Sequence, residues 1–342
     1  MRTIDDLEQK RKWIKDIEEN FSKPRDRRVH LYHYTSLPVL FNILETDSVW
    51  VSGTRFSNDS SEEILLNNEF FSDVNYRGDS FILCFSDKED CLSQWRGYCF
   101  NGGAAIEFDL KTPHNFSILH ADNETSQKYE LDYNAAFPVV YVDQSLLSPK
   151  STSLLDHLSD SASAFPTWEP GDMIPYLKDA AFEEESEWRL MFSNHKGELS
   201  KCVRFRTLHD GVKVPYMVVK VGDFGRKYSR SDFDVSEYQD GKKLDALREQ
   251  GILSILIPQG NNQESIYYQM ESIVAQHNNM NKGKTPIKIW CDGHLPIQRI
   301  IVAPTYDRER VAEKIKRYCW SNYWLRNVEV TYSSIPYIPP SE

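Results

Sequence analysis

Short apolar runs separated by polar segments are the feature of this sequence that most restricts its fold. The clearest runs are residues 80–85 (SFILCF), 214–220 (VPYMVVK), 252–257 (ILSILI) and 297–302 (IQRIIV). Runs of this length that are rich in β-branched residues are typical of buried strands. None approaches the roughly 20 apolar residues that a membrane-spanning helix needs. The sequence therefore predicts many short strands.

Helical patterns lie between these strands and predict a mixed α+β fold. Further strands are expected at 29–34, 49–51, 104–108, 139–142, 287–290 and 328–332, and residues 183–192 should pass from a loop into a strand. Helices are expected at 3–20, after Ser36, at 62–71, 90–97, 262–277 and 307–320, and within 145–170. We interpret residues 1–24 as an N-terminal helix and 25–342 as a single domain, with the patternless stretch 222–248 as a candidate insertion.

Charge and composition narrow the class of protein. The formal net charge is −11 and aromatic residues make up 13% of the chain. An acidic chain is poorly suited to gripping duplex nucleic acid over a broad surface, and this aromatic content argues against disorder. The N-terminal region is charged and lacks the apolar core of a secretory signal, so we expect a soluble, cytoplasmic protein with no membrane association. The six cysteines match no zinc-site spacing and are expected to be reduced, mostly buried thiols.

Familiar catalytic motifs are absent from the sequence. There is no phosphate-binding loop, no dinucleotide-binding glycine pattern, no H-E-x-x-H and no G-x-S-x-G. Asn101-Gly102-Gly103 is typical of a hairpin turn. Any chemistry must therefore come from less familiar arrangements.

Two N-terminal stretches carry polar groups suited to a site. His33 and Tyr34 lie on the first predicted strand, and Thr35 and Ser36 follow; alternatively, His33 is a core residue and the hydroxyls cap the next helix. A second stretch contains Asn58, Asp59 and Glu62. It could bind a ligand or simply form a turn with a helix cap.

Two later stretches complete the set. Ser86 is followed by Trp95 and Tyr98, whose spacing places both rings on one helical face, as core packing or as the wall of a site for a planar ring. Glu185 and Glu187 would point to the same side of a strand, because side chains alternate with a period of two. Arg189 falls on that side as well and could hold Glu187 ionised.

In their joint order, these motifs resemble the bacterial family known as domain of unknown function 2971. The residues that carry the resemblance are 31–36, Phe56, Asn58, Asp59, Glu62, 84–86, Trp95, Tyr98, 105–109, 187–189, 299–304, 328–332 and 334–337. The resemblance spans roughly 29–338. Ser60 departs from it, since the family often has Pro at that position.

A more distant resemblance, to the ADP-ribosyltransferase superfamily, implies a mainly antiparallel split-sheet core with peripheral helices. It implies NAD as co-substrate and no metal. The catalytic residues would be Glu187, Glu185 and His33; NAD would contact His33, Tyr34, Thr35, Ser36, Ser86, Trp95, Tyr98 and Arg189; and Asn58, Asp59 and Glu62 would contact substrate or acceptor. Tyr98 or Tyr34 would stack on nicotinamide.

The chemistry implied is cleavage of the nicotinamide glycosidic bond. Positive charge develops on the ribose, and a carboxylate beside it stabilises that state. A second acid could orient or deprotonate the acceptor, which could be protein, nucleic acid or water. Related families in this fold class often act as toxins or phage-defence effectors, so the resemblance implies that setting.

Two other functions stay open at this stage. A non-catalytic nucleotide-sensing or interaction module would keep His33 and an aromatic pocket without needing Glu187 at the ribose. A metal-dependent nuclease or nucleotide hydrolase would gather Asp59, Glu62, Glu107 and Glu187 around a divalent cation.

Overall fold

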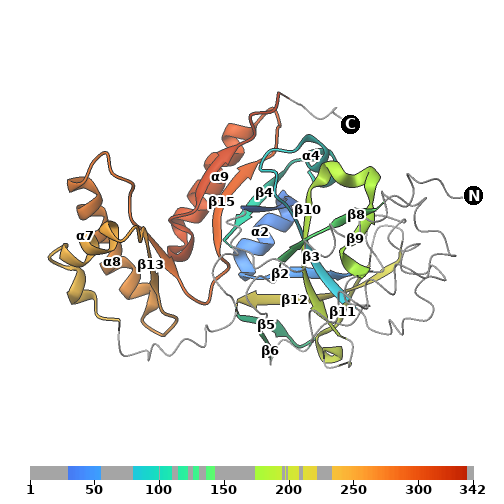
Figure 1. Cartoon of the computed structure of the whole chain (residues 1–342), viewed down its shortest axis with the longest axis horizontal. Helices are drawn as coiled ribbons and strands as arrows, with labels where there is room; N and C mark the ends of the chain where they lie inside the picture. The colour runs from blue at the N-terminus through green and yellow to red at the C-terminus, as the bar shows by residue number, and fades with distance from the viewer. Residues whose placement is uncertain are drawn as a thin grey trace, which may run out of the picture.

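The computed structural model of the chain describes residues 30–54, 80–99, 101–109, 115–121, 126–130, 136–142, 174–194, 197, 199–207, 211–221 and 233–336. Three of the expected helices, at 3–20, at 62–71 and within 145–170, lie outside these residues. The described part is a mixed α+β fold with a mainly antiparallel, open sheet of 12 strands (Figure 1). The predicted fold class is confirmed at this level.

The large sheet runs in the order β16-β15-β4-β1-β3-β2-β12-β5-β6, with β10, β7 and β11 joined beside this path. Its strands are β1 Leu31–Ser36, β2 Val49–Gly53, β3 Ser80–Ser86, β4 Gly103–Phe108, β5 Asn115–Leu119, β6 Ser126–Glu130, β7 Ala136–Pro138, β10 Glu187–Ser193, β11 Arg204–Thr207, β12 Lys213–Val221, β15 Ile297–Val302 and β16 Glu329–Tyr332. Within the described strands of this sheet, β15 and β16 form the one parallel pair. A short parallel pair, β8 Val140–Val142 and β9 Leu177–Asp179, stands apart from the sheet.

Strand β3 is the point at which the sheet divides. β10 pairs with β3 along its whole length, from Glu187 opposite Ser86 to Ser193 opposite Ser80. The other edge of β3 is shared by two strands: β1 contacts it only at Ser86, and β2 only near Ile82. β1 and β2 therefore part over the middle of β3, which leaves an opening in the sheet between them.

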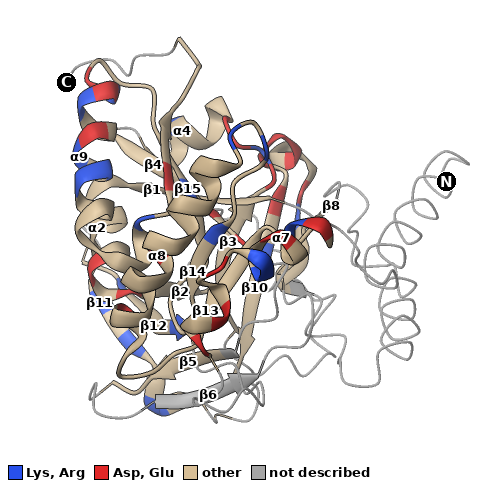
Figure 2. Ribbon diagram, turned by 90° about the vertical axis from the view of Figure 1, so that its left-hand side faces the viewer, with Lys and Arg blue, Asp and Glu red and all other residues tan. Residues whose placement is uncertain are grey.

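Helices cover both faces of the sheet. α2 (Leu37–Thr46) and α9 (Arg308–Ser321) contribute apolar side chains to the main core, together with strand residues such as Phe81 and Phe192. The outer side of α9 is charged (Figure 2), as expected for a helix with one apolar stripe. On the opposite face, α4 (Leu92–Tyr98) packs Trp95 against Tyr34 of β1, with ring centroids 4.6 Å apart.

A smaller lobe lies between β12 and β15 in the sequence and to one side of the sheet (Figure 1). It contains α7 (Lys242–Glu249), β13 (Ser254–Ile257), α8 (Gln263–Met280) and β14 (Lys288–Cys291), and the two strands pair in parallel. The lobe has its own apolar core, and Trp324 packs against both this core and the main one. Short 3₁₀ turns complete the described elements: η4 Ile174–Tyr176, η5 Ala180–Glu185, η6 Ser200–Cys202, η7 Val235–Tyr238 and η8 Tyr323–Leu325.

Most predicted strands and helices within the described residues are present, with ends shifted by a few residues. The first strand begins at Leu31 rather than at residue 29 and continues through Ser36. Within the candidate insertion 222–248, residues 242–248 belong to helix α7. This helix was not predicted, because it buries a single apolar residue, Leu244, and so shows no helical pattern. The short strands β5, β6, β9 and β11 were not predicted, because too few residues in each show a strand pattern.

The structure also shows the state of the cysteines and the character of the described helices. All six cysteines are free, and all except Cys84 are buried, which confirms their predicted state. No helix within the described residues combines the length and the apolar character that crossing a membrane requires.

Gly103 at the start of β4 tests the packing between the sheet and α4. A Cβ added there would lie 2.3 Å from the carbonyl oxygen of Thr35 and 2.6 Å from Sγ of Cys99. We expect Gly103→Ala to lower the free energy of unfolding by about 2 kcal/mol or more, because the contact involves backbone that cannot move away. Gly97→Ala is the control, since a Cβ at exposed Gly97 meets nothing within 4 Å. Urea unfolding should leave the control unchanged or slightly stabilised; equal effects would contradict the packing described.

Candidate functional site

A cavity of about 370 Å³ lies at the opening between β1 and β2. This volume falls within the range of small-molecule sites. Its lining comes from both sides of the opening, from α2 and α4, from the end of η5 and the start of β10, and from β11. The lining residues are Tyr32, His33, Tyr34, Thr35, Ser36, Val39, Ile43, Trp50, Ser52, Gly53, Ile82, Leu83, Cys84, Phe85, Gln94, Tyr98, Glu185, Glu187 and Arg206. Seven of the residues predicted from the sequence therefore share one cavity, namely His33, Tyr34, Thr35, Ser36, Tyr98, Glu185 and Glu187.

Glu187 is the most strongly held charged group in the cavity wall. Oε1 accepts a hydrogen bond from Nε of Arg189 at 2.8 Å, and Oε2 accepts from Nζ of Lys178 at 2.9 Å and from Nη2 of Arg189 at 3.1 Å. All three side chains are buried. Burial by itself would raise the pKa of Glu187, but Arg189, Lys178 and the thiol of Cys84 outweigh it and hold that pKa at about 2. Glu187 is therefore ionised at neutral pH, as predicted from its spacing to Arg189.

Glu185 also pairs with Lys178, but its position in the backbone differs from the predicted one. It does not lie on the strand with Glu187; it ends η5, and the intervening Ser186 has a left-handed backbone with φ of 47°. This turn reverses the local direction so that Lys178 Nζ donates to Glu185 Oε2 at 2.7 Å as well as to Glu187. The two carboxylates converge because they share Lys178, which reduces their mutual repulsion.

His33 is held in one tautomer by the backbone of β3. Its Nδ1 lies 2.9 Å from the carbonyl oxygen of Cys84, which can only accept, so Nδ1 carries the proton. Burial lowers the pKa of His33, and the bond to Cys84 opposes this shift. A neutral ring with a protonated Nδ1 leaves Nε2 as an acceptor.

The strand register places His33 and Glu187 on opposite faces of the sheet. Tyr32, Ser86 and Glu187 stand opposite one another across β1, β3 and β10, so their side chains share a face, and His33 points to the other one. Both line the cavity because β1 and β3 separate beyond this row. A ligand that contacts both must therefore lie in the opening itself.

The aromatic residues separate into a wall and a core. Tyr98 is 41% exposed and lines the cavity, and burial of its hydroxyl, followed by the nearby Cys84 and Glu185, raises its pKa. Trp95 is 1% exposed, does not line the cavity and donates from Nε1 to Asp90. Tyr34 is also buried, and its hydroxyl donates to the carbonyl of Lys88 and accepts from the N–H of Cys91. Tyr98 is thus the predicted aromatic residue whose ring is open to a ligand.

Two further predicted residues, Ser86 and Arg189, support the wall from outside the cavity. Ser86 is buried and donates to the carbonyl of Glu185 at 2.7 Å, which fixes the turn before Glu187. Arg189 also lies behind the wall. Thr35 and Ser36 end β1, and Ser36 occupies the N-cap position of α2 without a side-chain capping bond, which corrects the predicted capping role.

Sequence reasoning missed Lys178, Trp50, Ser52 and Arg206. Lys178 lies on the three-residue strand β9, where no periodic pattern marks it as buried. Arg206 lies in the sequence RFRT of β11, which reads equally well as an exposed strand. The predicted acceptor residues Asn58, Asp59 and Glu62 lie outside the described residues.

The metal-binding arrangement is not formed by the described carboxylates. Glu107 pairs with Arg299 and His30. Two strands, β1 and β3, lie between Glu107 and Glu187, a separation of roughly 14 Å at the usual strand spacing, which no single cation bridges. Within the described residues no group of three or more His, Cys, Asp or Glu side chains is placed to hold a metal ion.

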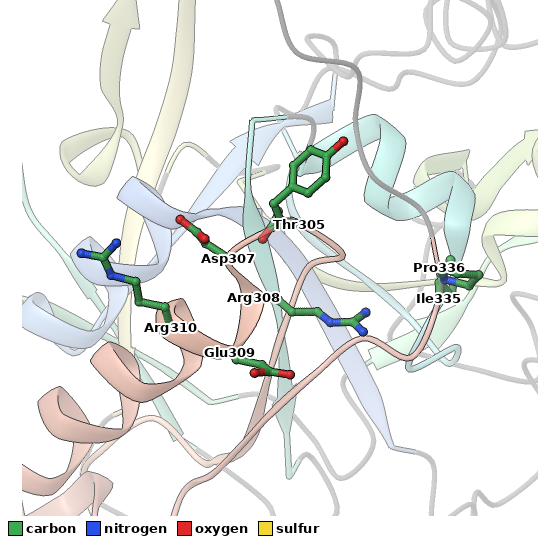
Figure 3. Close-up of a pocket in the computed structure, with 8 residues that line it drawn as sticks. Thr305, Asp307, Arg308, Glu309, Arg310, Ile335 and Pro336 are labelled. Atoms are coloured by element: carbon green, nitrogen blue, oxygen red, sulfur yellow. The ribbon is translucent and has the colours of Figure 1, made fainter.

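A second cavity, of about 560 Å³, lies at the start of α9 (Figure 3). Its walls are formed by residues 305–310 together with Ile335 and Pro336. None of the residues predicted to be catalytic or to bind a ligand lines this cavity. The opening in the sheet is therefore where the predicted polar groups gather.

Comparison with known proteins gives one match. A family model described as protein of unknown function (DUF2971) matches residues 94–190. This stretch runs from α4 to β10 and contains Tyr98, Lys178, Glu185 and Glu187, but not His33. The match supports the first resemblance over a shorter stretch than the motifs suggested. No curated protein and no solved structure matches the chain.

The buried ion pairs of Glu187 predict a specific pH dependence of stability. The pKa of Glu187 falls from an ordinary 4.5 to about 2 in the fold, so its stabilising contribution is complete above pH 4.5 and is lost as the pH falls towards 2. We expect the difference in unfolding free energy between the wild type and Glu187→Gln to shrink by roughly 2 kcal/mol between pH 6 and pH 3. Urea unfolding followed by tryptophan fluorescence measures this difference.

The control is Glu313→Gln, which changes an exposed carboxylate paired with Lys316 on α9. Surface pairs contribute little, so its difference from the wild type should stay near zero at every pH. A wild-type advantage over Glu187→Gln that does not change with pH would contradict the ionised, paired state of Glu187.

Proposed function

We propose that this chain is an NAD-consuming enzyme, either an ADP-ribosyltransferase or an NAD glycohydrolase, and that the opening between β1 and β2 is its active site. The observation that carries the proposal is a buried, ionised carboxylate, Glu187, in the wall of a ligand-sized cavity. A carboxylate fixed in that state can stabilise a cationic transition state without first losing a proton.

The surroundings of Glu187 support this chemistry. Neutral His33 offers an acceptor at Nε2, which suits a ribose hydroxyl, and the exposed ring of Tyr98 suits a planar base. Both groups therefore suit the proposed reaction, and the resemblance to the ADP-ribosyltransferase superfamily rests on the order of the motifs in the sequence.

The proposed reaction breaks the bond between C1′ of the ribose and the nicotinamide nitrogen. The bonding electron pair leaves with nicotinamide, whose ring loses its positive charge, and the ribose becomes oxocarbenium-like. Glu187 stabilises this charge. The acceptor then bonds to C1′ and loses a proton, which Glu185 accepts. Glu185 is suited to this step because Lys178 holds it beside Glu187.

The direct test is the release of nicotinamide from NAD by the purified full chain, measured by chromatography. We expect release by the wild type and a loss of at least a hundredfold in both Glu187→Gln and His33→Ala, equivalent to about 2.7 kcal/mol of transition-state stabilisation. Glu313→Gln is the control and should retain full activity, because that carboxylate is exposed on the outer side of α9. Full activity in Glu187→Gln would exclude the proposed role.

Glu185 separates transfer from hydrolysis. We expect Glu185→Gln to keep most of the nicotinamide release but to lose label transfer from radioactive NAD to an acceptor in cell extract, because the carboxylate acts on the acceptor rather than on the ribose. Equal loss of both activities would instead assign Glu185 to the glycosidic step.

One observation favours a second function, a non-catalytic nucleotide-sensing module. A carboxylate has about four acceptor sites, and Glu187 already receives three hydrogen bonds from Arg189 and Lys178. Such a saturated group resembles a structural ion pair. In that case NAD would raise the unfolding temperature of the wild type and the chain would release no nicotinamide, with or without cell extract.

A further inference from the structure

Besides Glu185 and Glu187, the cavity lining carries a positively charged side chain, Arg206, at the end formed by β2 and β11. Nη2 of Arg206 donates to Oγ of Ser52 at 3.2 Å. Nε of Arg206 is shielded from solvent and has no hydrogen-bond partner in the described part of the chain. Among the described residues, no Asp or Glu forms an ion pair with this guanidinium.

An unsatisfied buried N–H donor such as Nε of Arg206 costs free energy unless a ligand supplies the missing acceptor. The guanidinium fork matches the geometry of phosphate oxygens and binds them in pairs. We propose that Arg206 and Ser52 form a phosphate subsite, which takes the diphosphate part of the nucleotide ligand. This inference rests on the proposed function in that it identifies the ligand of the cavity as a dinucleotide such as NAD.

Strand register places the subsite on the same face of the sheet as Glu187. Glu187 stands opposite Ser86, and Ser52 stands opposite Ile82. Ser86 and Ile82 are four residues apart on β3, so their side chains point to the same face, and those of their partners do too. The carboxylate and the hydroxyl therefore open onto one surface of the cavity.

Arg206 reaches the same surface through β12. Tyr216 of β12 stands between Ser52 on β2 and Arg204 on β11, so all three share that face. Arg206 is two residues after Arg204 and points the same way. Its side chain then extends back over β12 to Ser52, which accounts for the hydrogen bond between two strands that are not neighbours.

The distance between the two ends of the cavity suits an extended ligand. Ser52 is displaced from Glu187 by four residues along β3 and by two strand spacings, roughly 16 Å between main chains at ordinary sheet dimensions. The side chains shorten this distance, but a single ribose cannot span it. In a dinucleotide the diphosphate adjoins the reacting ribose and so extends towards Arg206. Beside it, the 39% exposed ring of Trp50 packs on Tyr216 and offers a flat apolar surface.

The test compares Arg206→Met with Arg204→Met by isothermal titration calorimetry. Arg204→Met is the matched control, because Arg204 lies on the same strand and face and its substitution removes the same charge. Arg204 does not line the cavity, and it donates to the carbonyl oxygen of His120. The probes are NAD, ADP-ribose and inorganic pyrophosphate, with nicotinamide riboside as the phosphate-free probe. We expect Arg206→Met to weaken binding of the three phosphorylated probes at least tenfold and to leave nicotinamide riboside unchanged.

Arg206→Lys is the second variant in case Arg206→Met unfolds. It keeps the positive charge but lacks the planar fork, and it should show an intermediate loss. Unchanged affinity of Arg206→Met or Arg206→Lys for the phosphorylated probes would overturn the subsite, as would an equal loss in Arg204→Met.

The two proposals fail in different ways. If pyrophosphate and ADP-ribose binding depends on Arg206 while no nicotinamide is released from NAD, the subsite stands and the proposed reaction does not. If the wild type releases nicotinamide and Arg206→Met does so with unchanged KM, the reaction stands and the subsite is overturned.

Discussion

The structure depends on the fact that a strand has only two edges. On β3 one edge is filled by β10 along its whole length, and the other must accommodate both β1 and β2. Two strands cannot occupy one edge side by side, so they separate, and the sheet opens between them. The cavity, and the exposure of His33 and Cys84 to it, follow from this constraint. A fully paired sheet would have closed the same region.

The ionic cluster behind the cavity is the second organising feature. Three buried charged side chains, Lys178, Glu187 and Arg189, are tolerated because Glu187 pairs with both cations and Glu185 also pairs with Lys178. Removal of Glu187 would leave uncompensated positive charge in the interior. The cluster also joins three separate pieces of chain, since Lys178 lies on β9, Glu185 on η5 and Glu187 on β10. It therefore fixes the wall mechanically as well as electrostatically, and Ser86 adds a further tie to the same turn.

Local pattern predicts this fold where burial is continuous, and it fails where contacts are distant. The strand at Ser80–Ser86 is almost wholly buried, so its apolar run identifies it. Arg189 could be assigned to Glu187 because the two are neighbours on one strand. Lys178 could not, because its partnership depends on a turn at Ser186 with positive φ that no glycine marks. Arg206 was missed for a similar reason, since its contact with Ser52 crosses an intervening strand. The distant resemblance placed His33 and Glu187 in one site, and both line one cavity, but no local pattern could show that they approach it from opposite faces.

The order of the cavity-lining residues along the chain has a consequence for folding. His33, Ser52, Cys84, Tyr98, Glu187 and Arg206 come from six elements spread over more than half of the sequence. Contacts between such distant segments form only after large loops have closed, and they carry a high entropic cost until the whole sheet is assembled. The cavity is thus a late product of folding with no precursor in any single hairpin or helix. A truncated or partly folded chain would hold the same side chains but no enclosed space between them.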